Sequence, residues 1–230
     1  MRDDKINVIV KKIDWQIMED NFEKYEAVLY PARRNAVERL NNQRAKLASL
    51  ATGLLLQKVA KDELGIEPCD LVVGKGKHGK PYIENFPNFE FNISHSGDAV
   101  AIAYGENCVG LDIENIRCRE NDLKVAKRCF LEPEYIFVTD DAFELDMDGI
   151  SHPVEERFFM VWTMKEAYLK YKGTGISVPM NSFEVKPYEG IVVGEKLRCK
   201  PLIIDGYVCT VCVDDGVDVK FDFEGDFKLR

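Results

Sequence analysis

Val109-Gly110-Leu111-Asp112-Ile113-Glu114 ends in a strict alternation of apolar and acidic residues, the pattern of a half-buried β-strand. A period of two places Asp112 and Glu114 on the same face. Two carboxylates that close repel each other, so either one takes up a proton or a cation lies between them, and Mg²⁺ suits such a pair. The alternative is a solvated strand end.

The composition is that of an ordinary globular protein. The 230 residues are 46% hydrophobic and 10% aromatic, which is enough for a sizeable core. The formal net charge of -9 argues against general nucleic-acid binding, which needs clustered Lys and Arg. Two local basic groups could still hold a polyanion as small as a nucleotide: Arg33, Arg34, Arg39, Arg44 and Lys46, and Lys75, Lys77 and Lys80.

The sequence shows neither a membrane span nor a signal peptide. It has no run of about 18 apolar residues and no basic start leading into an apolar stretch. The 7 cysteines are irregularly spaced, which gives no disulfide framework and indicates a reducing compartment. Cys209 and Cys212 lie in a strand-like run without a second Cys pair, so we interpret them as core cysteines rather than zinc ligands. We expect a cytoplasmic protein without a membrane partner.

The hydrophobic pattern predicts an α+β fold. Residues 5–10 form an opening strand, and leucines at helical spacing predict a helix from Ala45 to Leu64 that Gly65 ends. Strand-like runs follow from Phe91 and again from Ser182 onward. Two α+β halves that meet near residue 114 are the simplest architecture.

The stretch from Gly74 to Pro81 is a near miss to a phosphate-binding loop. Pro81 stands where that loop has Ser or Thr, and Pro lacks both the hydroxyl and the backbone N–H. The residues that follow have no helical period, so no helix N-terminus is predicted there to bind an anion. We reject the P-loop and leave two alternatives, a turn from which Lys80 reaches a ligand and a plain hairpin turn.

Ser94 and His95 lie at the end of a strand-like segment, close in sequence to the acidic strand. Beside a basic group and a carboxylate pair, they indicate a site that holds both phosphate and metal. A structural histidine is the alternative. No nucleophile with a third orienting group can be assigned, so a serine-hydrolase triad is not inferred.

The stretch from Phe158 to Lys172 predicts a second long helix, closed by Gly173. Trp162, Glu166 and Lys170 follow at four-residue steps along one face. Glu166 would be a third carboxylate and Lys170 a phosphate clamp; a plain surface pair is the alternative. The buried stripe of this helix is predicted to be Val161, Met164, Tyr168 and Tyr171.

Five segments taken together resemble the 4'-phosphopantetheinyl transferases, in their larger, surfactin-synthetase-activating (Sfp) type. The combination is far more specific than any one of its parts. The segments are Gly79–Tyr82, Phe91–Gly97, Gly110–Glu114, Ala126–Phe130 and Trp162–Lys170.

The resemblance implies a monomer of two similar halves, residues 1–114 and 115–230, related by a pseudo-two-fold, with coenzyme A at their junction. It also implies the site residues. The expected metal ion is Mg²⁺, with Mn²⁺ as the alternative. Its expected ligands are Asp112, Glu114 and Glu166. The expected contacts of coenzyme A are Arg33, Ser49, Ser94 and His95 at the phosphates, Lys80 near the adenine and Lys170 at the pyrophosphate. A second basic position falls on Ala36, for which Arg34 or Arg39 would substitute.

The activity implied is transfer of the 4'-phosphopantetheine arm of coenzyme A to a serine of an apo acyl or peptidyl carrier protein, releasing adenosine 3',5'-bisphosphate. Glu166 would be the base that deprotonates the serine, and Lys165 would orient it. We expect the carrier to dock on an apolar and basic patch in the second half, near Cys129, Phe130 and the segment before Trp162. Two rivals are a metal-dependent phosphohydrolase and a non-catalytic coenzyme-binding module.

Overall fold

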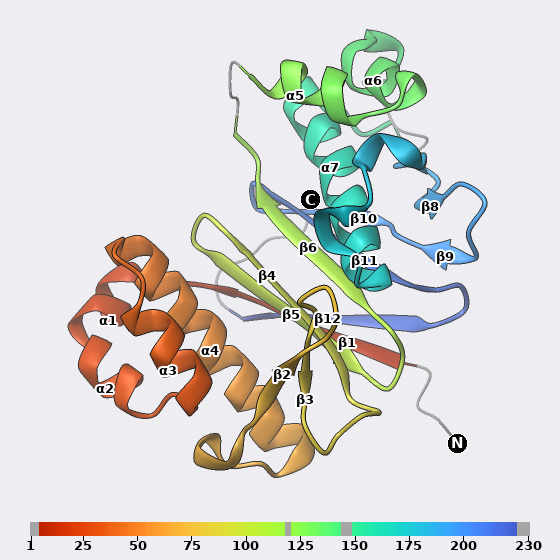
Figure 1. The fold of residues 1–230 in the computed structure, drawn as a ribbon. Coiled ribbons are helices and arrows are strands. Elements are labelled where there is room, and N and C mark those ends of the chain that lie inside the picture. Colours follow the sequence, from red (N-terminus) through yellow and green to blue (C-terminus); the bar gives the residue numbers. More distant parts are fainter. Residues whose placement is uncertain (1–4, 118–120, 144–148, 225–230) are drawn as a thin grey trace.

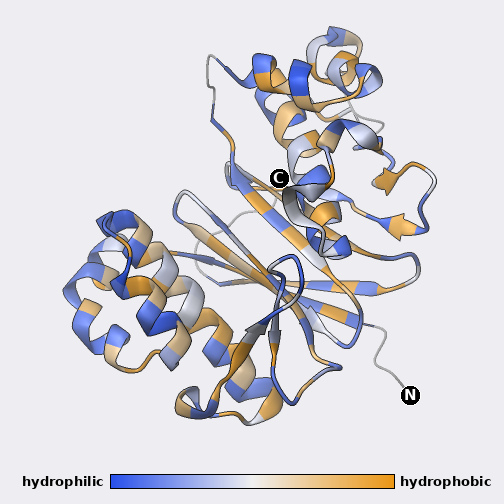
Figure 2. Ribbon diagram, viewed as in Figure 1, coloured by the Kyte–Doolittle hydropathy of each residue, from blue (hydrophilic) through white to orange (hydrophobic). Residues whose placement is uncertain are grey.

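The computed structural model describes residues 5–117, 121–143 and 149–224, which form a mixed α+β fold. Figure 1 shows the strands in the middle of the molecule, with one group of helices on each side. The helices are α1 (Trp15–Asp20), α2 (Phe22–Ala27), α3 (Pro31–Glu38), α4 (Gln43–Leu64), α5 (Asp122–Cys129), α6 (Glu132–Thr139) and α7 (Val154–Lys172). Figure 2 shows hydrophobic residues along the central strands.

The first sheet has the strand order β12-β1-β5-β4. Its strands are β1 (Lys5–Lys12), β4 (Glu90–Ser96), β5 (Ala99–Gly105) and β12 (Asp218–Glu224). β1 and β5 pair antiparallel, whereas β12 pairs parallel to β1, with Val8 opposite both Ala103 and Phe221. The last described strand of the chain therefore completes the sheet that the first strand began.

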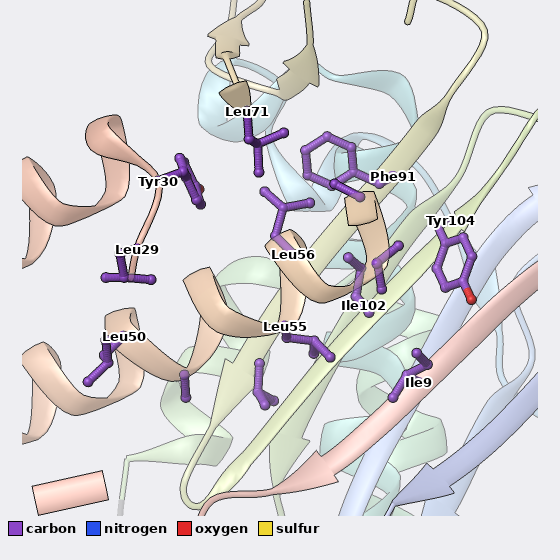
Figure 3. Close-up of a cluster of buried hydrophobic side chains, with 14 of the residues drawn as sticks. Ile9, Leu29, Tyr30, Leu50, Leu55, Leu56, Leu71, Phe91, Ile102 and Tyr104 are labelled. Atoms are coloured by element: carbon purple, nitrogen blue, oxygen red, sulfur yellow. The ribbon is translucent and has the colours of Figure 1, made fainter. Parts of the chain in front are cut away.

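α4 packs on this sheet and forms a hydrophobic core with it (Figure 3). The helix starts at Asn42, whose side chain accepts a hydrogen bond from the Ala45 N–H, and ends at Gly65 with φ 67°. Leu50 and Leu56 of α4 are almost fully buried, together with Phe91 and Ile102 of the sheet. The helix predicted from leucine spacing is thus confirmed, and the core explains that spacing.

The second sheet takes strands from the rest of the chain. Its order is β10-β11-β9-β8-β7, and β6 pairs with β11 off that path. Its strands are β6 (Gly110–Asn115), β7 (Val185–Lys186), β8 (Ile191–Val192), β9 (Leu197–Arg198), β10 (Pro201–Ile204) and β11 (Tyr207–Asp214). The sheets do not divide at residue 114, because β6 belongs to the second sheet and β12 returns to the first.

α7 packs against β6 and β11, so the two informative stretches of the sequence lie side by side. Gly110 permits this contact, because a Cβ there would lie 1.9 Å from the Ala167 carbonyl oxygen. Val161, Met164 and Tyr168 are buried and Tyr171 is partly buried, which confirms the predicted stripe. Gly173 ends the helix with φ 63°.

The structure agrees with the expectation for the stretch from Gly74 to Pro81 and agrees only in part with that for the cysteines. β2 (Val73–Lys75) and β3 (Pro81–Ile83) form an antiparallel hairpin with no helix after it, in agreement with the rejection of a P-loop. Cys209 and Cys212 are buried, as expected of core cysteines. Cys212, however, is bonded to Cys199 in a disulfide, a pairing that the irregular spacing of the cysteines did not indicate.

Candidate functional site

β4 and β6 lie next to each other where the two sheets meet, and side chains of β4 bond to side chains and backbone N–H groups of β6. Ser94 Oγ donates to Asp112 Oδ1 at 2.8 Å, and Ser96 Oγ donates to Glu114 Oε2 at 2.6 Å. Asn92 Oδ1 accepts a hydrogen bond from the Leu111 N–H at 3.3 Å. The two-residue period of each strand therefore matches two serines to two carboxylates.

Asp112 is the centre of this junction and is 4% exposed. Its Oδ1 accepts from Lys170 Nζ at 2.7 Å as well as from Ser94. Its Oδ2 is buried and has no hydrogen-bond partner among the described residues. A buried carboxylate oxygen without a donor is costly, so this atom is suited to bind a cation.

Glu166 lies one helical turn before Lys170 on the same half-buried face of α7. Burial raises the pKa of its carboxyl group, and the negative charges of Asp112 and Glu114 raise it further against the effect of Lys170. The charges of Asp112 and Glu114 therefore act on the carboxyl group of Glu166. The surface-pair interpretation of Glu166 and Lys170 fits less well, because Lys170 pairs with Asp112 instead.

The three carboxylates fit a hard divalent cation by their chemistry. Within the described ranges no three or more Asp, Glu, His or Cys side chains stand close enough to hold a metal ion. The buried Asp112 Oδ2, which has no donor among the described residues, nevertheless fits such a cation. Mg²⁺ prefers oxygen ligands of this kind.

A cavity of about 380 Å³ opens beside this junction. It is walled by α4, by the turn of the β2–β3 hairpin, by β4 and by the end of α7. Its basic and titratable lining residues are Arg33, His78, Lys80, His95 and Lys170. The charge of this lining is positive, in contrast to the chain as a whole, so the cavity suits a small polyanion.

Arg33 reaches the cavity from α3 by crossing α4. Its guanidinium donates to Ser49 Oγ at 3.4 Å and to Tyr30 Oη at 3.2 Å. Gly53 makes room for it, because a Cβ at that position would lie 2.5 Å from Arg33 Cγ. The structure therefore brings Arg33 and Ser49 together, as their expected shared role requires.

His95 follows Ser94 on β4 and points to the opposite face of the strand, so it lines the cavity while Ser94 bonds Asp112. Loss of surrounding water lowers the pKa of its imidazole, and the positive charges of Lys170 and Arg33 lower it further. Its ring is therefore neutral at pH 7. A phosphate group nearby would reverse this balance.

Lys80 lies in the turn of the β2–β3 hairpin and also lines the cavity. Its Nζ donates to Glu90 Oε2 at 3.0 Å and to the Val109 carbonyl oxygen at 3.3 Å. This side chain thereby links the hairpin to β4 and to the residue before β6. Of the two alternatives for the turn, a hairpin is present and its lysine faces the cavity.

Lys165 does not belong to this site, so the expectation that it orients Glu166 was wrong. Its Nζ lies 2.6 Å from Glu134 Oε1 and donates to the carbonyl oxygens of Met180 and Phe183 at 2.8 and 2.7 Å. The side chain is 0% exposed. A fully buried ammonium needs such partners, and they hold it away from the cavity.

Two other expectations also need correction. Arg34 donates to the backbone carbonyls of Glu26, Ala27 and Leu29, so its guanidinium ties α3 to the preceding residues and does not replace a phosphate contact at Ala36. Phe130 is 5% exposed and packs against Phe158, so its ring cannot form part of a docking surface.

Ser96 is the residue that the sequence analysis missed. A signal for it existed: Ser94 and Ser96 are spaced like Asp112 and Glu114, so two strands side by side would match both pairs. Without knowledge that β4 and β6 are neighbours, the second serine had no assigned partner.

Two protein-family models match consecutive parts of the chain. The model described as the N-terminal part of 4'-phosphopantetheinyl transferase matches residues 13–107, and that of the 4'-phosphopantetheinyl transferase superfamily matches residues 108–212. The boundary between them falls just before β6. Together the two models match residues 13–212, so β1 and β12 lie outside the matched region.

Curated relatives agree with the models. The chain is 30% identical over 214 residues to the 4'-phosphopantetheinyl transferase gsp of Aneurinibacillus migulanus, covering 90% of this chain and 85% of the relative. It is 28% identical over 177 residues to the 4'-phosphopantetheinyl transferase Sfp of Bacillus subtilis, covering 77% and 75%. A mouse relative, L-aminoadipate-semialdehyde dehydrogenase-phosphopantetheinyl transferase, is 28% identical and covers 77% of this chain and 59% of its own length.

The two family models and the curated relatives define one class of protein, the enzymes that transfer phosphopantetheine. The chain belongs to the 4'-phosphopantetheinyl transferase family, in its Sfp type, and is an enzyme of that family. Among the helices described, none combines the length and the apolar character needed to span a bilayer.

Proposed function

We propose that this enzyme transfers the 4'-phosphopantetheine arm of coenzyme A to a serine of an apo acyl or peptidyl carrier protein, in a reaction that needs Mg²⁺ or Mn²⁺. Adenosine 3',5'-bisphosphate is the second product. The observation that carries the proposal is the meeting of Asp112, Ser94 and Lys170 beside a basic cavity. The relatives' names support the same transfer.

Coenzyme A would bind at the junction of the two halves, residues 1–114 and 115–230. The cavity supports this placement, because it is walled by α4 from the first half and by the end of α7 from the second. Arg33, Ser49 and His95 would hold its phosphates, and Lys80 would lie near the adenine. Lys170, already within reach of Asp112, would neutralise the pyrophosphate.

The metal, held by Asp112, Glu114 and Glu166, would supply positive charge at the phosphate under attack. The protein's own residues must align the serine hydroxyl and remove its proton. Glu166 is the base in this proposal, acting directly or through a water. A carboxylate bound to a metal is a weaker base than a free one, so the two roles of Glu166 compete. Lys170 stabilises the negative charge that builds on the leaving bisphosphate.

The carrier protein would dock on α5, which follows β6 after residues 118–120. Its exposed side chains include Leu123, Lys124, Lys127 and Arg128. Leu123 is 43% exposed, and the three basic residues carry positive charge on a chain whose net charge is negative. A basic helix with an apolar residue suits an acidic carrier, since electrostatic complementarity raises the rate of encounter. This surface replaces the one expected at Phe130.

The pseudo-two-fold relation of the halves, the monomeric state and the cytoplasmic location remain proposals. Support for the first comes from the packing: α4 covers a face of the first sheet, and α7 covers β6 and β11 of the second. Analytical ultracentrifugation of the purified chain would show one species of 26.3 kDa if the protein is a monomer.

Quantifying coenzyme A and its products by chromatography, with and without an apo carrier protein, separates the transferase from its rivals. The transferase releases adenosine 3',5'-bisphosphate only when the carrier is present. A phosphohydrolase would consume coenzyme A without any carrier. A binding module would leave coenzyme A intact in both reactions, which would overturn the proposal.

A further inference from the structure

Ser96 lies at the end of β4, directly opposite Glu114 of β6. Its side chain is buried, with 7% of the residue exposed, although it is next to the turn that leads into β5. Its Oγ donates to Glu114 Oε2 at 2.6 Å and accepts a hydrogen bond from the Asn115 N–H at 3.1 Å. One hydroxyl therefore holds both the carboxylate and the backbone of the residue that follows it.

The contact of Ser96 repeats the contact that Ser94 makes one step along the strand. Ser94 donates to Asp112 with a similar short distance, 2.8 Å. Asp112 also receives the ammonium group of Lys170, whereas Glu114 is half-buried at the end of β6. Ser94 and Lys170 thus hold Asp112 from two sides, and Ser96 holds Glu114 at the next step along the strand.

We propose that Ser96 is a positioning residue that orients the carboxylate of Glu114 for binding the divalent cation. The inference rests on the proposed function, because the cation belongs to that reaction. A hydrogen bond from a fixed hydroxyl restricts the orientation of the carboxylate, and residues that orient metal ligands contribute strongly to metal affinity. The accepted Asn115 N–H fixes the hydroxyl rotor, so that its proton points at Glu114.

The backbone bond to Asn115 raises a structural alternative. In that alternative Ser96 only completes the hydrogen bonding of the edge between the two sheets, as Asn92 does for the Leu111 N–H. Removal of the hydroxyl would then lower the melting temperature and leave cation binding unchanged. Cation affinity, measured without turnover, separates the two roles.

The test is a titration of Mn²⁺ into the enzyme with coenzyme A present, following free Mn²⁺ by electron paramagnetic resonance. Ser96→Ala is compared with the wild type and with Thr139→Val. The control removes a half-buried hydroxyl of α6 that donates to the Tyr135 carbonyl oxygen at 2.9 Å. Melting temperatures of all three proteins are recorded in the absence of Mn²⁺.

We expect Ser96→Ala to raise the Kd for Mn²⁺ by about tenfold or more, and Thr139→Val to leave it unchanged. An unchanged Kd in Ser96→Ala would overturn the positioning role, even if its melting temperature fell. Arm transfer by the wild type is measured in parallel. If the wild type transfers the arm, an unchanged Kd overturns the role of Ser96 alone and leaves the proposed function standing. Absence of Mn²⁺ binding by the wild type would overturn both.

Discussion

Lys170 Nζ lies 2.7 Å from Asp112 Oδ1 and 3.0 Å from Ser94 Oγ, so one ammonium group of α7 joins the strands of both sheets. The Lys170 side chain is 29% exposed and lines the cavity, whereas that of Asp112 is 6% exposed. The same contact therefore stabilises the junction and presents a positive charge to a bound phosphate.

Replacing Lys170 by Met is expected to lower kcat for arm transfer by about 10²–10³-fold, the usual loss when a charge that stabilises the transition state is removed. The measurement is the initial rate at saturating coenzyme A and carrier. Lys172→Met is the matched control on the same helix, because Lys172 pairs with Glu195 at the surface. Equal losses in the two variants would refute the role assigned to Lys170.

The buried pair of Lys165 and Glu134 is expected to act on stability and not on chemistry. Lys165→Met should lower the free energy of unfolding by about 3–5 kcal/mol, because it leaves Glu134 buried without its counter-charge. The double variant Lys165→Met/Glu134→Gln should recover part of that loss, since no uncompensated charge remains. Denaturant unfolding measures both values.

Activity completes the test of Lys165. We expect the double variant to transfer the arm at a rate within about threefold of the wild type at temperatures where it is folded, a spread of under 1 kcal/mol in the barrier. If the folded double variant lost activity, the conclusion that Lys165 acts on stability alone would be wrong.

His95 makes the binding of adenosine 3',5'-bisphosphate depend on pH. The pKa of free His95 is lowered from 6.5, and a bound phosphate dianion favours the protonated ring, so binding raises this pKa. Binding then takes up a proton, and affinity should increase as pH falls from about 8 to 6. Each pKa unit gained on binding contributes up to about tenfold.

Calorimetric titrations of the wild type and His95→Asn at several pH values check this expectation. The phosphate group itself titrates near pH 6 and does so with both proteins, so the difference between them reports His95. For folding the sign is opposite: a lowered pKa makes the wild type lose stability as pH falls below about 6.5, and His95→Asn should lose less. Parallel affinity curves would refute the contact.

Reversing the charges of α5 should impair carrier docking alone. The triple variant Lys124→Glu/Lys127→Glu/Arg128→Glu is expected to raise the KM for an acidic carrier by about tenfold or more, and the effect should weaken at high salt. The KM for coenzyme A should not change, because none of the three residues lines the cavity. An equal rise in both KM values would indicate misfolding instead of lost docking.

Much of the fold could be predicted because its main elements carry local signals. The alternation before Glu114 gave β6, and Gly65 and Gly173 marked the ends of α4 and α7, where the chain adopts a left-handed conformation. The parallel pairing of β12 with β1 had no such signal. It depends on contacts between the two ends of the chain, which no local pattern encodes.

The site divides in the same way. The meeting of Asp112 with Lys170 could be predicted from the strand and helix periods together with the resemblance to the family. The partners of Lys165 and Arg34 could not, because a lysine or arginine in a sequence does not reveal whether its charge meets a carboxylate, a carbonyl group or water. Glu134, which binds Lys165, comes from another helix.

The most direct test of the account is the intact mass of an apo carrier protein after incubation with coenzyme A and Mg²⁺, using the wild type and Asp112→Ala. The account predicts that the wild type adds the mass of one phosphopantetheine arm, that a chelator abolishes the addition, and that Asp112→Ala adds none. Wild-type protein that leaves every carrier unmodified, or Asp112→Ala that labels the carrier as fast as the wild type, would contradict it.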